Sequence, residues 1–135
     1  MITKEFLTAG QAIFTVSNPS GEHYTYKVSA PYKQSETNPF WFVKVLTGPD
    51  NTRDYTYAGL LQHTGNLVVT AKSKYKSDSK PFLVAKWAIS VIWGELNIPD
   101  GYKIQHEGRC GRCGRSLTDP TSIETGLGPI CAGRN

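Results

Sequence analysis

The chain has 135 residues, of which 39% are hydrophobic and 19% charged, and its formal net charge is +4. This is the composition of an ordinary globular domain, and it excludes an intrinsically disordered chain. No apolar run approaches the roughly 20 residues that span a bilayer, and the N-terminal segment lacks the apolar stretch of a signal peptide. We therefore expect a soluble cytoplasmic protein with no membrane partner.

Residues 11–70 predict a meander of β-strands. Five segments read as strands, 11–16, 23–28, 40–46, 54–61 and 67–70, and residues alternate at period two in 23–28 and 54–61. Turn-forming residues separate several of them, as at 18–21 and 48–51. In the strongest strand, Trp41, Val43 and Val45 share one face, and Phe40 and Phe42 share the other.

A change of period after residue 80 predicts one helix. Residues 82–95 contain neither Gly nor Pro before Gly94, and Val84, Trp87, Ala88 and Val91 form an apolar stripe at helical spacing. Ser79 is a plausible N-cap, with Pro81 in the first turn. Because the segment has few polar residues, we expect most of the helix to be buried against the sheet.

These elements predict an α+β fold, in which an antiparallel β-meander sheet is packed by one buried helix. Residues 1–100 form this sheet-and-helix body, and residues 101–135 form a small C-terminal zinc module. The turn-rich connection at 96–105 is too short to be a free linker, so we expect the two parts to dock together.

The three cysteines all lie between residues 110 and 131. An odd, clustered set favours metal binding over a disulfide framework. Cys110 and Cys113 form a Cys-x2-Cys pair followed by Gly114, a spacing that lets two thiolates bind one ion. Residues 119–120 read as the start of a short helix that Gly126 ends, after which the chain bends back to Cys131.

A structural zinc site needs a fourth ligand. His106, just upstream of the pair, is the strongest candidate, and Asp119 and Glu124 are less common alternatives. The competing interpretation of His106 is a surface histidine at a strand end. We predict one structural zinc ion held by His106, Cys110, Cys113 and Cys131.

The string from Cys110 to Cys131 resembles a zinc module found in bacteriophage and mobile-element proteins, a family of unassigned function. Its pattern is Cys-x2-Cys-Gly-Arg-x-Leu, then Asp-Pro and Ser, then Gly-x-Gly-Pro-x-Cys. The family's fourth ligand is a Cys or His just upstream of the pair, which matches His106. The body, with Thr25 and Tyr26, resembles the domain that precedes this module in small phage proteins. The resemblance implies a phage-type protein in the cytoplasm of a bacterial host, and it supplies no activity.

Nothing in the sequence forms a catalytic constellation. His106 and Glu107 lie too close to the cysteine pair for the deaminase pattern, and the glycine-rich tracts lack the phosphate-loop lysine. A site with four protein ligands is closed to water and substrate. We therefore expect no enzyme and no small-molecule substrate.

Two basic clusters suggest binding to DNA or RNA. Residues 72–86 carry five lysines and one aspartate. If residues 71–76 continue the last strand, Lys72, Lys74 and Lys76 share a face that phosphates attract. The full predicted interface adds a stacking tyrosine, one more lysine and three arginines around the zinc pair: Tyr75, Lys80, Arg109, Arg112 and Arg115. A solvated loop with solubilising arginines is the competing interpretation.

The alternative function is a protein-binding adaptor, or an inhibitor of a bacterial host protein such as a defence protein. An exposed aromatic sheet face, either Phe40 with Phe42 or Tyr24 with Tyr26, would be its surface. We favour core positions for these aromatics, since period-two stripes usually face inward.

Overall fold

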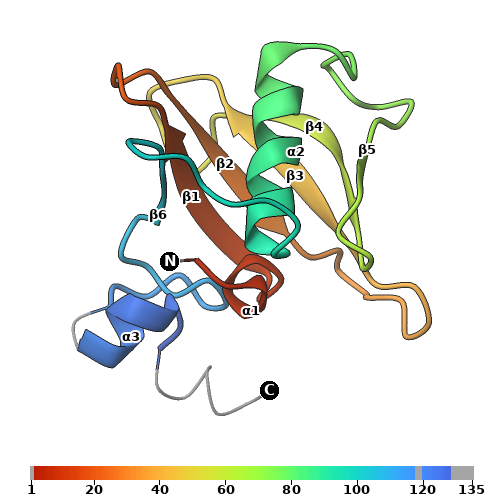
Figure 1. Cartoon of the computed structure of the whole chain (residues 1–135). Coiled ribbons are helices and arrows are strands. Elements are labelled where there is room, and N and C mark those ends of the chain that lie inside the picture. The colour runs from red at the N-terminus through yellow and green to blue at the C-terminus, as the bar shows by residue number, and fades with distance from the viewer. Residues whose placement is uncertain (1, 118–119, 129–135) are drawn as a thin grey trace.

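The computed structural model describes residues 2–117 and 120–128. Three helices and six strands follow one another along this part of the chain (Figure 1). They are α1 (Lys4–Leu7), β1 (Gln11–Ser17), β2 (His23–Ser29), β3 (Phe40–Leu46), β4 (Tyr55–Gln62), β5 (Leu67–Val68), α2 (Lys80–Ile92), β6 (Lys103–His106) and α3 (Pro120–Thr125).

The strands form one antiparallel sheet in the order β5-β4-β3-β2-β1-β6. The first five strands follow one another as a meander, which confirms the predicted α+β class. The sixth strand adds to the free edge of β1, where Phe14 pairs with His106 and Val16 with Ile104. The sequence had placed most of β6 in a connection, so its return to the sheet was not predicted.

Helix α2 crosses one face of the sheet (Figure 1). Alternation along the strands turns Phe14, Tyr26 and Val43 toward it, and all three are fully buried. The Tyr26 hydroxyl donates to the carbonyl of Pro81 at 2.7 Å, which anchors the first turn of α2 to β2. The predicted helix and its packing against the sheet are confirmed.

The buried side of α2 is rotated from the predicted stripe. Ala88 and Val91 are buried as expected, but Val84 and Trp87 are only partly buried. Phe82, Ala85 and Ile89 complete the buried side instead. The reason is that Trp87 packs beside Tyr102, with ring centroids 5.6 Å apart, at the margin of the core.

The basic segment after β5 does not continue the strand, because β5 ends at Val68. The backbone N–H of Thr70 donates to the Ser73 hydroxyl at 2.9 Å, and the N–H of Ser73 donates to the Thr70 carbonyl at 3.0 Å. This turn reverses the chain, and the N–H of Lys74 then donates to the Tyr57 carbonyl at 3.0 Å. The expected single face of Lys72, Lys74 and Lys76 is therefore absent.

The short helix α1 was not predicted, and it occupies the junction between the sheet and the C-terminal module (Figure 1). Thr3 caps it by accepting from the N–H of Phe6 at 3.2 Å. Phe6 and Leu7 are fully buried. The indole N–H of Trp41 donates to the Thr8 carbonyl at 3.1 Å, which ties the end of α1 to β3.

Within the described ranges, none of the helices has the length and apolar character needed to cross a membrane.

Candidate functional site

The two cysteines of the Cys-x2-Cys pair lie on a tight backbone turn, residues 109–116, which we call the cysteine turn. The N–H of Gly114 donates to the Cys110 carbonyl at 2.9 Å, and the N–H of Cys110 donates to the Arg115 carbonyl at 2.8 Å. A bridge between Arg109 and Ser116 closes the turn. Gly114 has φ +78°, a conformation that glycine adopts without steric cost. The sequence pattern thus forms the tight turn that its glycine predicts.

The Cys110 sulfur lies in an environment that stabilises a thiolate. It accepts from the backbone N–H of Arg112 at 3.4 Å and from that of Gly128 at 3.3 Å. Burial raises the pKa of the Cys110 thiol, but hydrogen bonds from Gly128, Cys113 and Arg112 outweigh burial and lower that pKa to about 6. Cys110 is buried and Cys113 is exposed. A sulfur that carries negative charge and accepts several amides suits a metal ligand.

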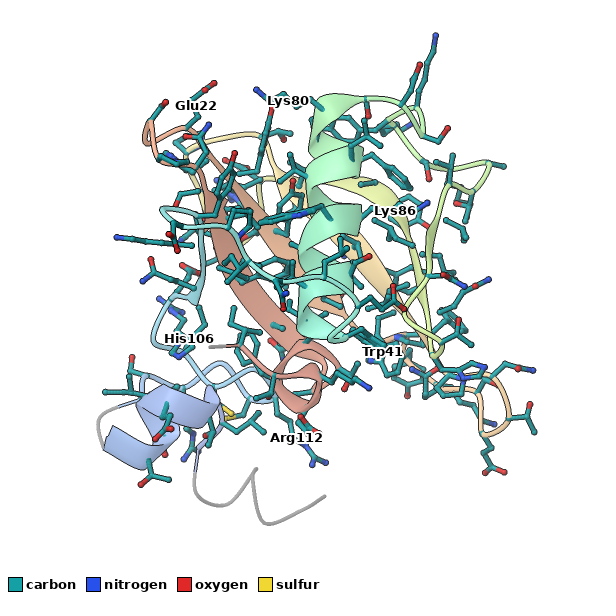
Figure 2. All side chains as sticks on the ribbon, viewed as in Figure 1. Glu22, Trp41, Lys80, Lys86, His106 and Arg112 are labelled. Carbon is teal, nitrogen blue, oxygen red and sulfur yellow. The ribbon has the colours of Figure 1, made fainter. Side chains whose placement is uncertain are left out.

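His106 lies where β6 meets the C-terminal module (Figure 2). Its Nδ1 accepts from the backbone N–H of Gly108 at 2.8 Å. Its Nε2 pairs with the carbonyl of Ile123 in α3, and because that carbonyl can only accept, Nε2 donates. The ring also packs on Phe6, with centroids 5.5 Å apart. Zinc ligation by His106 requires the release of one of these two hydrogen bonds, so its role as a ligand stays a prediction.

The remaining predicted ligand, Cys131, and the alternative Asp119 lie outside the described residues. Among the residues that the structure does describe, no three His, Cys, Asp or Glu side chains converge as a metal site. The predicted short helix is present as α3, and Gly126 ends it with φ +75°. The cysteine pair fits a metal, and the four-ligand site stays a prediction.

Phe6 of α1 packs directly against the module. A Cβ at Gly111 would lie 2.7 Å from the Phe6 ring, and one at Gly126 would lie 2.4 Å from it. The N–H of Gly111 donates to the Gly126 carbonyl at 2.8 Å, and the N–H of Gln11 donates to the Gly111 carbonyl at 2.7 Å. The two glycines thus allow the backbone of the module to close over an aromatic side chain of the body.

The predicted phosphate-binding residues occupy two separate regions. Arg109, Arg112 and Arg115 are exposed on the cysteine turn, and Figure 2 shows Arg112 at the module end of the molecule. Ion pairs in the described part of the chain join Arg53 to Asp50 and Lys80 to Glu22. The three arginines therefore have no acidic partner within that part.

The lysine segment is divided by the turn after β5. Lys72, Lys74 and Lys76 are exposed, but Tyr75 packs against the core. Burial, followed by the nearby Tyr24, raises the pKa of Tyr75. This arrangement does not support the predicted role of Tyr75 as a base-stacking ring. Lys80 begins α2 and lies 3.7 Å from the Glu22 carboxylate.

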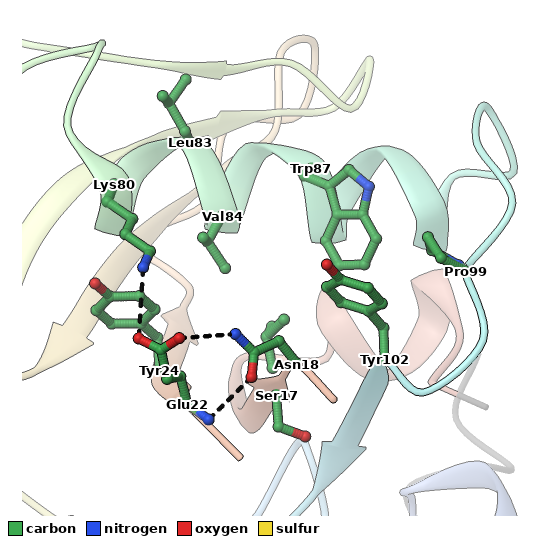
Figure 3. Close-up of a pocket in the computed structure, with 11 residues that line it drawn as sticks. Ser17, Asn18, Glu22, Tyr24, Lys80, Leu83, Val84, Trp87, Pro99 and Tyr102 are labelled. Carbon is green, nitrogen blue, oxygen red and sulfur yellow. Dashed lines mark hydrogen bonds and ion pairs between the residues drawn. The ribbon is translucent and has the colours of Figure 1, made fainter. Parts of the chain in front are cut away.

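An apolar groove of about 390 Å³ runs beside α2 on the covered face of the sheet (Figure 3). Trp87 and Tyr102 form one end of it, and Leu83 lies along its rim with 48% of its surface exposed. At the other end, Glu22 accepts from the Asn18 side-chain amide at 3.1 Å. No sequence pattern indicates this groove, because it forms where three distant segments meet.

The opposite face of the sheet carries a cluster that sequence reasoning placed mainly in the core. Phe42 and Lys44 of β3 and Tyr57 and Leu60 of β4 line a hollow of about 510 Å³ on this face. These side chains are half-buried. Among the described elements, no helix covers this face, which we call the open face. The alternation of Phe40 and Phe42 with buried valines was the sequence signal that could have identified this face.

Comparison with known proteins links only the C-terminal module to a family. Residues 104–135 match a Family of unknown function (DUF6011). This match agrees with the resemblance of the cysteine string to a family without an assigned function. No curated protein and no solved structure matches the chain.

Proposed function

We propose that this chain is a non-enzymatic nucleic-acid-binding protein of the bacteriophage or mobile-element type, stabilised by one structural zinc ion. It acts in the cytoplasm of a bacterial host. The observation that carries the proposal is the cysteine turn, which combines a thiolate-stabilising sulfur with three exposed arginines that have no acidic partner in the described residues.

Zinc has a structural role in this proposal. Cys110, Cys113, His106 and Cys131 hold it, and the metal supplies a cross-link where apolar packing is sparse. Cys110 and Leu127 form a small cluster of their own, with Ala9 and Leu117 packed against it. In this proposal, the cluster seen in the described residues is too small to order the module by itself, and metal binding supplies most of the module's folding free energy.

The cations bind the phosphate backbone. Guanidinium groups form paired hydrogen bonds with phosphate oxygens, and each phosphate neutralised releases counterions. Arg109, Arg112 and Arg115 project from a turn that zinc makes rigid. Lys72, Lys74 and Lys76 form a second basic cluster on a loop that hydrogen bonds fix to β4. Such contacts position the nucleic acid without reading its sequence.

Salt-dependent binding tests this proposal. Fluorescence anisotropy with labelled single-stranded DNA, RNA and duplex DNA at low salt measures affinity for the wild type and for two triple glutamine variants. One variant replaces the three arginines, and the other replaces Lys72, Lys74 and Lys76. For duplex DNA the slope of log affinity against log salt becomes shallower by about two to three units in a variant whose residues contact phosphate, near 0.9 per contact.

A third triple variant is the matched control. It replaces three exposed lysines that lie elsewhere, Lys4, Lys33 and Lys86, and thus removes the same charge. Its slope stays close to that of the wild type. Absence of binding to all three nucleic acids by the wild type overturns the proposed function.

The α2 groove favours a second candidate, a protein-binding adaptor or an inhibitor of a bacterial host protein. An apolar side chain of a partner would enter between Leu83 and Trp87 (Figure 3). A host protein retained by the wild type and lost with Leu83→Asp, combined with no nucleic-acid binding, would select this candidate.

A further inference from the structure

The open face is built by the register of three neighbouring strands. Lys27 of β2 pairs with Lys44 of β3, and Lys44 pairs with Tyr57 of β4. In the next row, Phe42 pairs with Leu60. Since the strand residues between them turn inward, as Val43 does, these five side chains share the face that α2 does not cover.

Three aromatic rings form a continuous run on this face. The centroids of Phe40 and Phe42 are 5.6 Å apart, and those of Phe42 and Tyr57 are 6.0 Å apart. Both contacts are edge-to-face, so neighbouring rings stand at steep angles to one another. The Tyr57 hydroxyl lies 3.0 Å from the Thr70 hydroxyl, a hydrogen bond that fixes the orientation of this ring.

Two hollows adjoin one another along the run and share Leu60 as a wall. The first, of about 510 Å³, is lined by Phe42 and Tyr57, and Lys72 forms its rim. The second, of about 320 Å³, lies beside Phe40 and carries the polar side chains of Gln62 and His63. Neither lining contains an acidic residue. The walls are thus aromatic and the rims are polar or cationic.

The open face carries lysines without ion-pair partners in the described part of the chain, and such a positive surface attracts a polyanion. Lys27 and Lys44 are cross-strand neighbours, and like charges in that position destabilise a sheet. Burial, followed by the nearby Lys27, lowers the pKa of Lys44. Within the described residues, neither lysine forms an ion pair. A bound phosphate would relieve the repulsion that the free protein tolerates.

Two carboxylates limit the part of the open face that suits an anion. Burial, followed by Glu107 and Asp50, raises the pKa of Tyr55 to about 12, so both carboxylates lie near that ring. Lys27 also lies over the Tyr55 ring, 5.8 Å from its centroid. The region suited to phosphate therefore centres on Lys44 and Lys72, which line the same hollow, and not on Lys27 beside Tyr55.

We propose that the open face binds single-stranded nucleic acid, with unpaired bases in the two hollows against Phe40, Phe42 and Tyr57 and phosphates at Lys44 and Lys72. The inference rests on the proposed nucleic-acid-binding function and names the strand form that the protein takes. In a duplex the base faces are already stacked, whereas a single strand can present them to aromatic side chains. A protein partner would gain nothing from two neighbouring unpaired lysines unless it were acidic.

Binding of homopolymer strands tests this inference. Labelled oligo(dT) and oligo(U) of about 12 nucleotides, within the site size of single-strand-binding folds, are compared with a duplex of equal length. Single strands bind more tightly than the duplex, and the ratio of the two homopolymers distinguishes DNA from RNA. Phe42→Leu keeps an apolar side chain but removes the ring, and it weakens single-strand binding about 5- to 100-fold, the loss expected for one stacked base.

Two matched control variants show whether a loss of binding is specific to changes on the open face. Tyr102→Ala removes a partly exposed ring from the α2 groove on the other face and leaves binding unchanged. Lys44→Gln weakens binding, whereas Lys86→Gln removes the same charge from α2 (Figure 2) and does not. A thermal unfolding scan of each variant identifies any loss caused by unfolding, and Lys44→Gln tests the same face without removing a ring.

The outcomes distinguish this inference from the proposed function. If the wild type binds duplex and single strands equally and both open-face variants bind like the wild type, the inference is wrong and the proposed function stands. If an acidic protein competes for this face and nucleic acid does not, the inference is also wrong. If the wild type binds no nucleic acid at all, both fail together.

Discussion

The sheet-and-helix body and the C-terminal module are stabilised by different means. In the body, α2 and one face of the sheet bury a continuous core that includes Phe14, Tyr26 and Ile89, all fully buried. In the described part of the module, Cys110 and Leu127 are the buried members of the local apolar cluster. The body gains its stability from apolar burial, whereas the described part of the module shows backbone hydrogen bonds to the Cys110 sulfur, where we propose a zinc ion.

The contact between the two parts shows how they depend on each other. Phe6 belongs to the body in sequence, yet its ring touches Gly111, Gly126 and His106 of the module. The described part of the module, whose own apolar cluster is small, thus packs against one aromatic side chain of its neighbour. Loss of the proposed ion, of the Phe6 ring or of His106 therefore tests, in three different ways, how the module depends on the body.

Loss of a cysteine ligand has the largest expected effect. Cys110→Ser removes the buried sulfur that accepts the backbone N–H groups of Arg112 and Gly128, and zinc binding to small modules supplies about 10–16 kcal/mol. The variant purifies without zinc, and nuclear magnetic resonance shows loss of ordered amide signals in the module while those of the body persist. Wild type purifies with about one zinc per chain, as a single tetrahedral site requires. Loss of the body signals as well would mean that the two parts fold as one unit.

Truncation of the shared ring comes next. Phe6→Ala lowers the free energy of unfolding by about 3–5 kcal/mol, because it empties a fully buried site. It also speeds the release of zinc to a chelator. Phe82→Ala, which truncates a buried ring of α2 remote from the module, is the control. Equal rates of zinc release in the two variants would show that Phe6 does not couple the parts.

Replacing His106 has a smaller effect, because three thiolates remain. His106→Ala lowers zinc affinity by more than about 10- to 100-fold, the loss caused by removing a residue that only orients a metal ligand. Competition with a chromogenic chelator measures it, and His63→Ala, on a loop beside the open face, is the control. Unchanged affinity in His106→Ala would assign the fourth ligand to another residue and leave His106 as a link between β6 and α3.

The smallest expected effect is a gain in the free energy of unfolding when one lysine of the open face is replaced. Lys44→Gln removes one of two like charges on neighbouring strands and raises the free energy of unfolding by roughly 0.2–1 kcal/mol. Because the pKa of Lys44 is lowered from 10.5 in the folded state, the unfolded chain holds the proton to higher pH, so wild-type stability rises with pH in that interval. The advantage of Lys44→Gln therefore shrinks as pH approaches 10.5. Urea unfolding measures it, with Lys86→Gln as the control, and a loss of stability in Lys44→Gln would contradict the repulsion.

Sequence periodicity predicted the elements whose signal is local. The strand at 40–46 and the helix after Ser79 were both found because their apolar spacing identifies them without their partners. Helix α1 was not predicted, because four residues are too few to show a helical period. Strand β6 was not predicted, because its pairing with β1 joins segments about ninety residues apart. The lysine segment was misplaced because a Thr70–Ser73 turn overrides its alternation.

The same distinction applies to the candidate site. The backbone turn at 109–116 follows from local spacing, whereas the zinc site proposed on it stays a prediction. The open face depends on which side of β3 the helix covers. Sequence alternation assigns Phe40 and Phe42 to one side of the strand, but it does not say whether that side faces a helix or solvent.

The pairing of β6 with β1 has a consequence for the solution behaviour of the protein. β6 leads directly into the cysteine turn, and it covers the outer edge of β1 from Phe14 to Ser17. If the proposed zinc is bound and its loss loosens β6, these backbone groups become an unpaired strand edge, the kind of surface through which sheets of separate molecules join. Zinc would then also act as a safeguard against self-association, and preparations exposed to chelators would form aggregates before the core itself unfolds.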